Sequence, residues 1–236
     1  MTEYLYMKDA DSCYIKEFKA VVKDTGEDWV ILDRSAFYPE GGGQPTDRGK
    51  IEWDGGEANV VRVTKRDGGR HYLEGAVPPK GTEVQGTIDW KRRYGHMRAH
   101  TSQHIISAVV WDKWQAKTVG NQIHEARARI DLHPLKLTEE DVKWVEEECN
   151  RRISQNIDVK IYELSREEAE EKAGVERCNM ELLPASVKKL RIVQVGDEIC
   201  PCAGTHVKNT SEIGTLKITK KESKGKMRAR ITYELV

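Results

Sequence analysis

The chain has 236 residues, of which 39 are Lys or Arg and 39 are Asp or Glu, so its formal net charge is zero. Zero net charge excludes a uniformly basic coat for nucleic acid but leaves room for a local basic patch. With 38% hydrophobic residues, the chain has enough apolar material for a core, which argues against wholesale disorder. Its longest apolar runs, such as residues 105–110, are far shorter than the roughly 20 residues that span a bilayer, so we expect no membrane association.

The cysteine count indicates the compartment. Five cysteines, an odd number, argue against a disulfide framework and for a reducing environment. The N-terminus lacks a charged stretch followed by an apolar one, so we expect no signal peptide. Together these features predict a cytoplasmic protein.

The first 90 residues are predicted to form short strands separated by turns, without a helical apolar period. Glycine-containing turns join most of these strands, which is a hairpin signal. Several short strands at close spacing favour a small β-barrel. The predicted strands are residues 18–23, 29–33, 59–64, 70–73 and 82–88.

Beyond residue 90, helices and strands mix, which is typical of an α+β fold. One helix is expected over residues 94–114. A second begins at Thr138, which has capping-box spacing to Asp141, and a third runs from Ser165 to the stop signal Gly174. Strands are expected at residues 127–132, 157–164, 190–195, 214–219 and 227–235. We therefore predict a barrel domain over residues 1–90 and a second domain over residues 91–236.

Four residues of the second domain have the spacing of metal ligands. His100 and His104 lie four residues apart, so on a helix both imidazoles face the same way. Cys202 and His206 add a thiolate and a third imidazole, and Gly204 between them allows a tight turn. A His₃Cys set of nitrogen and sulfur ligands in fourfold geometry is typical of zinc.

Several alternatives stay open for this set. A zincin peptidase is excluded, because its motif needs Glu after the first histidine and Thr101 stands there. A purely structural zinc is possible, since four protein ligands close the shell. Cys200 is an alternative thiolate, although Cys202 belongs to the Cys-x-x-x-His unit and is favoured. His100 and His104 also fit core or surface histidines without a metal.

The two ligand motifs resemble the editing domain of alanyl-tRNA synthetase. That domain carries an HxxxH motif and a Cys-Gly-Gly-Thr-His-like unit, matched here by residues 100–104 and 202–206, with Ala203 in place of one glycine. Arg92 and Arg93, with residues 97–100, resemble the lead-in to its first helix. Residues 37–49 resemble the glycine-rich segment of the barrel that precedes it. Because the chain has no room for an aminoacylation domain, it resembles the free-standing alanyl-tRNA editing proteins, the AlaX family in its medium-length form.

This resemblance implies a trans-editing hydrolase. Such an enzyme deacylates tRNA(Ala) mischarged with serine, and possibly glycine, and spares Ala-tRNA(Ala). The implied fold is a small β-barrel followed by a two-layer α/β editing domain. The implied metal is Zn²⁺, which would anchor the aminoacyl group or polarise a water. The ligands carried over are His100, His104, Cys202 and His206. Two other functions stay open: a deacylase for another aminoacyl-tRNA, and a non-catalytic tRNA-binding module with a structural zinc.

Discrimination between serine and alanine requires polar groups near the metal. Alanine fits wherever serine fits, so the site has to hydrogen-bond the serine hydroxyl. For each candidate, an ordinary polar surface residue is an equally open interpretation. The candidates are Thr101, Thr118, Asn121 and Gln122.

The segment Gly41, Gly42, Gly43 and Gln44 has two interpretations. It is either a loop that approaches the aminoacyl end of the substrate, since glycine permits close backbone approach, or an ordinary turn between strands. It lacks the Gly-Lys-Ser/Thr of a Walker loop and opens no helix. We therefore expect no nucleotide cofactor.

Contact with tRNA phosphates requires lysine or arginine. Basic residues gather before His100, at Lys188, Lys189 and Arg191, and on the predicted C-terminal hairpin, where Lys217 and Arg230 also lie. The other interpretation of each run is a solvated face. No pattern in the sequence indicates an oligomeric state. The predicted contacts are Arg92, Arg93, Arg98, Lys220, Lys221, Lys224, Lys226 and Arg228.

Overall fold

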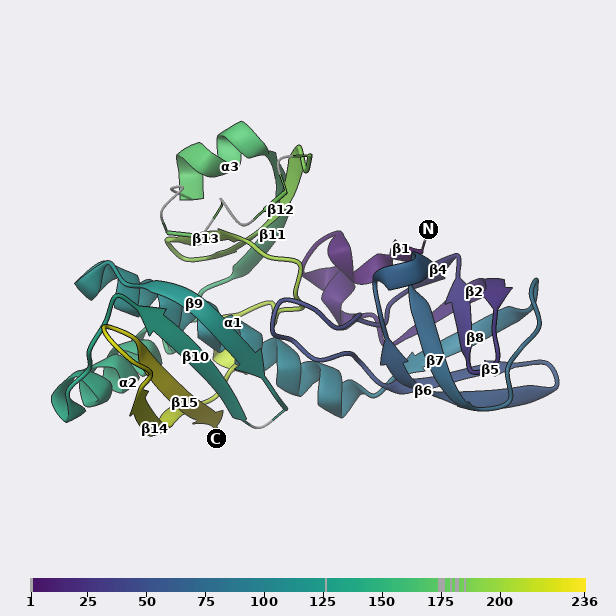
Figure 1. Ribbon diagram of the computed structural model, residues 1–236, viewed down its shortest axis with the longest axis horizontal. Helices are drawn as coiled ribbons and strands as arrows, with labels where there is room; N and C mark the ends of the chain where they lie inside the picture. Colours follow the sequence, from purple (N-terminus) through teal and green to yellow (C-terminus); the bar gives the residue numbers. More distant parts are fainter. Residues whose placement is uncertain (1, 126, 174–176, 179, 181–182, 185) are drawn as a thin grey trace. The chain divides into compact units, whose positions relative to one another are not determined.

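The computed structural model describes residues 2–125, 127–173, 177–178, 180, 183–184 and 186–236. The chain divides into two compact units, Met1–Tyr94 and Gly95–Val236, and most of their helices and strands are labelled in Figure 1. The division lies a few residues beyond the predicted boundary and falls inside helix α1 (Trp90–Trp114). Among the described residues, no helix is long and apolar enough to cross a membrane.

The first unit is built on a closed barrel with the strand order β2-β3-β7-β6-β5-β8. All neighbouring strands in it are antiparallel. Alternate side chains face inward, and Phe18, Val30, Leu32, Ile51 and Val60 form part of its apolar core. The predicted small β-barrel is therefore confirmed. The strands are β2 (Glu17–Thr25), β3 (Trp29–Leu32), β5 (Gly49–Trp53), β6 (Gly56–Val63), β7 (Arg70–Gly75) and β8 (Glu83–Ile88), beside a short parallel pair of β1 (Glu3–Tyr4) and β4 (Arg34–Ser35).

Strand β5 is not among the predicted strands, yet it closes the barrel by pairing with β6 and β8. Ile51 is its one fully buried side chain, so the apolar alternation that marks the other strands is too weak here. Partners distant in sequence, not local pattern, make this segment a strand.

Arg93 is fully buried in the first unit. Its guanidinium forms an ion pair with Asp47, with Nε 2.8 Å from Oδ2, and its Nη atoms donate to the carbonyls of Cys13 and Ala36. The Asp47 carboxylate also accepts the backbone N–H of Tyr38 at 2.7 Å. The prediction that Arg93 contacts tRNA is therefore wrong, because its charge is enclosed and paired inside the protein.

His71 is a second polar residue inside the barrel unit. Its Nε2 lies 2.7 Å from Oγ of Ser35, and its Nδ1 lies 3.0 Å from the carbonyl of Gly69. Burial lowers the pKa of His71 to about 4, although the backbone hydrogen bonds oppose that shift. The imidazole is therefore neutral near pH 7.

We expect His71 to make stability pH-dependent in mildly acidic solution. Its pKa is lowered on folding to about 4, so between pH 6.5 and 4 the unfolded state binds more protons. Stability is unaffected above pH 6.5 and is lost as the pH falls, by about 2 kcal/mol at pH 5. Urea unfolding measures the free energy of unfolding at pH 7.5 and at pH 5. The difference between the two values should be smaller in His71→Gln than in wild type. The exposed His124→Gln serves as control; equal losses in both variants would contradict the assignment.

The second unit contains two antiparallel sheets and most of α1. One sheet has the order β14-β15-β10-β9 and the other the order β11-β12-β13. The hydroxyl of Tyr233 on β15 donates to the carbonyl of Ala99 on α1, and Asn150 on α2 bonds the backbone of Leu216 on β14. The elements are β9 (Lys117–Ile123), β10 (Arg127–His133), α2 (Glu139–Ile153), β11 (Val159–Ser165), α3 (Arg166–Ala173), β12 (Lys189–Val195), β13 (Glu198–Pro201), β14 (Leu216–Ser223) and β15 (Ala229–Leu235).

The helix starts follow local capping chemistry. Thr138 and Asp141 form the predicted capping box of α2, and Ser165 and Glu168 exchange the same bonds at α3. The predicted stop at Gly174 lies outside the described residues. Helix α1 begins four residues earlier than predicted, because the carboxylate of Asp89 accepts the Arg92 backbone N–H at 3.2 Å.

Candidate metal centre

Helix α1 and the loop after β13 bring together the four predicted ligands. Donor atoms of His100, His104, Cys202 and His206 all lie within 4.8 Å of one another. Sγ of Cys202 lies 3.5 Å from Nε2 of His100 and 3.3 Å from Nε2 of His206. A tetrahedral zinc with ordinary bond lengths separates sulfur and nitrogen ligands by about 3.6 Å. The spacing therefore fits this metal. Cys200 belongs to a different group of side chains.

The protonation state of the histidines suits a cation. Burial lowers the pKa of His104 to about 4, and the charge of Arg191 adds to that effect. Burial also holds the pKa values of His100 and His206 well below their usual range, with neighbouring histidines contributing. Neutral imidazole is the form that binds metal. Among the described residues, none hydrogen-bonds the buried Nε2 of His104, so a bound cation would satisfy an otherwise costly atom.

Thr101 orients the imidazole of His206 through Nδ1, the ring nitrogen that does not face Cys202. Its hydroxyl donates to the carbonyl of Met97 at 2.9 Å, accepts the backbone N–H of Val207 at 3.3 Å and lies 3.2 Å from Nδ1 of His206. Because the hydroxyl proton is used, Nδ1 of His206 carries the proton of that contact and Nε2 is left unprotonated. Thr101 is fully buried, and its contact with the substrate stays a prediction.

Replacing Thr101 by valine is expected to weaken metal binding about 10- to 100-fold, the usual effect of losing a hydrogen bond that orients a ligand. Valine keeps the shape but cannot hold the His206 tautomer. Competition with a chelator would measure the affinity, and Thr101→Ser should restore most of it. Equal affinities for wild type and Thr101→Val would show that the contact is not needed.

A polar group continues along α1 beyond the histidines. Oε1 of Gln103 accepts the side-chain amide of Asn121 at 2.6 Å, and the hydroxyls of Ser107 and Thr118 are 2.7 Å apart. The spacing of residues 100, 103, 104 and 107 puts these α1 side chains on the same face as the ligands. Thr118 and Asn121 on β9 were predicted, whereas Gln103 and Ser107 were missed, although that helical spacing marks them.

Gln122 does not belong to this group. Its side chain is exposed, and Oε1 accepts from Nε of Arg129 at 2.9 Å. Neighbouring residues of a strand point to opposite faces, so the position next to Asn121 faces the other side of the sheet. The prediction of Gln122 as a pocket residue is wrong.

The glycine-rich segment of the first unit forms a tight turn. The backbones of Gly41 and Gln44 exchange hydrogen bonds of 3.2 and 2.9 Å. Between them, Gly42 and Gly43 have φ values of 58° and 80°, which favour glycine. Tyr38 donates its hydroxyl to the carbonyl of Gly41 at 2.8 Å. Gly42 is exposed and the Gln44 side chain is buried.

The arginines before the histidines, which are predicted to contact tRNA, already donate hydrogen bonds to the protein backbone. Nε of Arg92 donates to the carbonyl of Thr46 at 3.1 Å, and Nε of Arg98 donates to that of Ile213 at 3.0 Å. Arg191 is buried and donates to the carbonyl of Cys202 at 2.6 Å. It therefore supports the cysteine loop, and its predicted exposure to tRNA is wrong.

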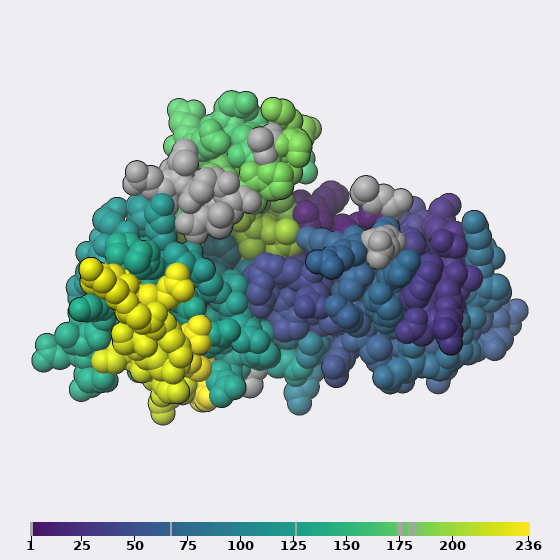
Figure 2. Space-filling model, viewed as in Figure 1, coloured from purple at the N-terminus to yellow at the C-terminus, as the bar shows by residue number. Residues whose placement is uncertain are grey.

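The C-terminal hairpin, β14 and β15, lies at the surface, yellow in Figure 2. Several of its cations are neutralised: Lys220 and Lys224 pair with Glu222, and Lys221 pairs with Glu139 at 2.7 Å. Arg230 likewise pairs with Asp131. Within the described ranges, the exposed Lys217, Lys226 and Arg228 make no such ion pair, so the predicted patch is smaller than its composition suggests.

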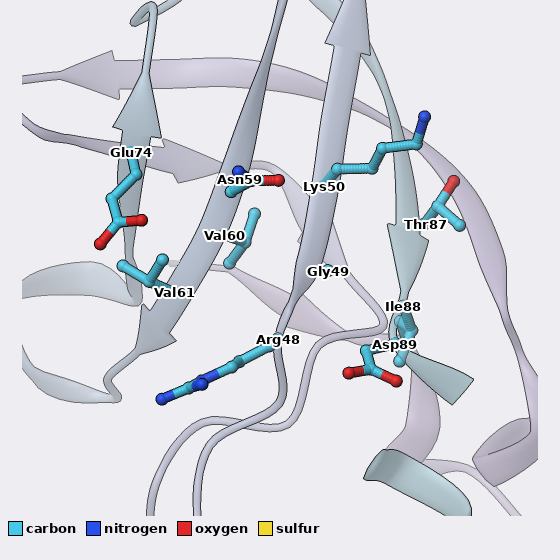
Figure 3. A pocket seen from close by; sticks show the side chains of 10 residues that line it. All are labelled: Arg48, Gly49, Lys50, Asn59, Val60, Val61, Glu74, Thr87, Ile88 and Asp89. Carbon is cyan, nitrogen blue, oxygen red and sulfur yellow. The ribbon is translucent and has the colours of Figure 1, made fainter. Parts of the chain in front are cut away.

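The first unit also has an open pocket of about 450 Å³. Figure 3 shows Arg48, Lys50, Glu74 and Asp89 among its lining side chains. Two cations and two anions give this pocket no single sign of charge, so it is not a phosphate-binding basic patch.

Comparisons with known proteins establish the family of this chain. Residues 190–232 match the family described as the threonyl and alanyl tRNA synthetase second additional domain, and residues 6–92 match class II (A) tRNA synthetases. The alanyl-tRNA editing protein AlaX-M of Methanosarcina barkeri is 43% identical over the full length of both chains. That of Methanosarcina acetivorans is 39% identical, also over both full lengths. The chain belongs to the AlaX-M family. The resemblance seen in the sequence is thereby confirmed.

Alanine–tRNA ligases share the same region with AlaX-M. The Archaeoglobus fulgidus ligase is 40% identical over 94% of this chain, which corresponds to 24% of the ligase. The Pyrococcus furiosus ligase is 39% identical over the same share of this chain. This chain thus matches about a quarter of each ligase.

Proposed function

We propose that this protein hydrolyses the ester of tRNA(Ala) mischarged with serine, or with glycine, and spares Ala-tRNA(Ala). The observation that carries the proposal is the convergence of His100, His104, Cys202 and His206 into one buried group. The relatives named alanyl-tRNA editing protein AlaX-M supply the substrate class. A role in aminoacyl-tRNA editing would place the protein in the cytoplasm. The two-layer α/β arrangement of the editing domain stays a prediction.

The side chains of His100, His104, Cys202 and His206 offer four donor atoms to a divalent cation. Zinc held there would act as a Lewis acid toward the ester carbonyl or a water. His100 and His104 offer imidazoles from successive turns of α1, and Thr101 fixes the tautomer of His206. The backbone N–H of Gly204 lies 3.4 Å from Sγ of Cys202, where it stabilises the thiolate form that binds metal.

Selectivity for serine is proposed to come from the polar pairs beside the ligands. A hydroxyl-bonding site rejects alanine, because its polar groups are left unpaired when the substrate hydroxyl is missing. Ser107 with Thr118, and Gln103 with Asn121, supply hydroxyl and amide groups on the α1 face that carries the histidines. Contact of the turn at Gly42 with the aminoacyl end stays a prediction.

A second function is a non-catalytic tRNA-binding module with a structural zinc. The convergence of four protein donors favours it, since structural zinc sites are closed by four ligands. Turnover separates the two functions. A deacylase must convert many equivalents of mischarged tRNA, whereas a binding module releases the aminoacyl-tRNA intact.

The test is deacylation of Ser-, Gly- and Ala-charged tRNA(Ala) by the zinc-loaded protein. We expect multiple turnovers with the serine or glycine ester and little with the alanine ester. Thr118→Val should narrow the difference between Ser-tRNA(Ala) and Ala-tRNA(Ala), with Val119→Thr, which adds a hydroxyl at the exposed neighbour, as control. Binding without turnover on all three substrates would leave the structural zinc as the better function.

Phosphate contact by the C-terminal hairpin gives a salt-dependence prediction. Lys226→Ala/Arg228→Ala should weaken tRNA binding and reduce the slope of log K against log salt by about two, because each lost phosphate contact removes about one. The matched control is Lys220→Ala/Lys224→Ala, which removes cations already paired with Glu222. Filter binding over a salt series measures both slopes. Unchanged slopes in the first variant would remove the hairpin from the interface.

A further inference from the structure

A second group of metal-binding side chains lies in the same unit. One donor atom each from Cys178, Glu198 and Cys200 lies within 4.8 Å of the other two. The described part of the chain has one other such group, the His₃Cys set. The proposed editing chemistry uses none of these three side chains, so their convergence needs its own explanation.

The fold builds this group from two segments. Glu198 and Cys200 are alternate residues of β13, so their side chains leave the same face of the strand. Cys178 comes from the chain after α3, and its Sγ lies 3.2 Å from the carbonyl of Ile199. Cys178 and Ile199 both pack against the apolar cluster that contains Met180 and Ile192. Packing therefore holds the thiol over β13.

The charges in this group are compatible with a bound divalent cation. The Glu198 carboxylate is nearly fully buried and forms an ion pair with Arg177. Burial raises the pKa of Glu198 to about 7, although Arg177 opposes that shift. A divalent cation bound here would displace the thiol protons, because thiolate is the form that binds metal. Two thiolates, one carboxylate and one guanidinium then sum with the cation to zero, so the occupied site leaves no uncompensated buried charge.

We propose that Cys178, Glu198 and Cys200 form a second zinc site, distinct from the His₃Cys centre. Thiolates are soft ligands that select zinc over magnesium or calcium, and a carboxylate is a common third zinc ligand. The site ties the segment after α3 to β13, the strand that leads directly to Cys202. It rests on the geometry of these three residues and stands apart from the editing function.

Metal stoichiometry tests the second site. Wild-type protein is loaded with excess zinc under a reductant, freed of unbound metal by gel filtration and analysed by elemental mass spectrometry. We expect two equivalents per chain, falling to one in Cys178→Ser. The matched control Cys149→Ala alters a buried cysteine outside both groups and should keep two equivalents. The proposal is overturned if Cys178→Ser holds as much zinc as wild type, whether wild type binds one equivalent or two.

Failure of the first metal centre is distinguishable from failure of the second. If the His₃Cys set binds no zinc, wild type holds one equivalent, and Cys178→Ser loses it while His104→Ala keeps it.

Glu198→Gln is the second variant, should Cys178→Ser fail to fold, and is expected to lower zinc affinity at one of two sites. Cobalt substitution of wild type needs no variant: thiolate-to-cobalt absorption should keep rising beyond one equivalent. Saturation at one equivalent with the absorption of a single thiolate ligand, or a Cys178–Cys200 disulfide that persists in the presence of reductant, would count against the site.

Discussion

His104→Ala is expected to lose deacylation of Ser-tRNA(Ala) by at least about 100-fold, together with most of its zinc affinity. Loss of a group that merely orients a ligand costs about 10- to 100-fold, so removal of a ligand costs at least as much. The three remaining ligands also no longer complete the fourfold coordination of the metal. The imidazole itself is buried and neutral, because burial lowers its pKa to about 4. Alanine leaves an apolar hole that offers no lone pair to a cation.

Single-turnover deacylation and zinc content, measured on the same preparation, check this expectation. The exposed His124→Ala is the matched control and should keep both properties. Circular dichroism of His104→Ala confirms that α1 remains folded. Full activity in His104→Ala, or in wild type verified as metal-free, would rule out a role for this centre in the reaction.

Asp47→Ala is expected to lower the free energy of unfolding by about 3–5 kcal/mol, the usual cost of breaking a buried ion pair. The carboxylate is the charged partner of the fully buried Arg93 guanidinium and accepts the backbone N–H of Tyr38. Without it, a positive charge stays enclosed among the carbonyls of Cys13 and Ala36. The loss therefore comes mainly from the unpaired charge, not from the missing attraction.

Urea unfolding of four variants, each compared with wild type, separates these contributions. Asp47→Asn keeps hydrogen bonding but removes the charge, so it should lose less than Asp47→Ala. The double variant Asp47→Leu/Arg93→Met removes both charges and should be more stable than Asp47→Ala. Glu40→Ala is the surface control, since it breaks an exposed pair with Arg62 and should lose less than about 1 kcal/mol. A loss from Asp47→Ala no larger than that of Glu40→Ala would mean that the buried pair contributes little.

Local chemistry explains which features were predictable. The capping boxes at Thr138 and Ser165 depend on residues three positions apart, so their sequence spacing is their geometry. The His100–His104 pair depends on one turn of helix for the same reason. The barrel was predictable as a class, because alternating short strands have few other ways to bury one face.

Arg93 and Arg191 show where local pattern fails. Each lies in a basic run that favours a phosphate-binding surface, and each is buried against partners distant in sequence: Asp47 for Arg93 and the Cys202 carbonyl for Arg191. The role of Thr101 depends on His206, 105 positions away. A charge run predicts solvent exposure only when no distant carboxylate or carbonyl encloses it.

The sequence by itself indicated the two ligand motifs, the capped starts of α2 and α3 and the likeness to alanyl-tRNA editing proteins, because each motif consists of residue types at short, fixed spacings. The tertiary structure alone decided that Cys202 and not Cys200 joins the histidines, that Cys200 meets Cys178 and Glu198, and which basic residues stay exposed. These outcomes depend on contacts between segments tens of residues apart. Such contacts arise from packing and burial, which a linear pattern does not record.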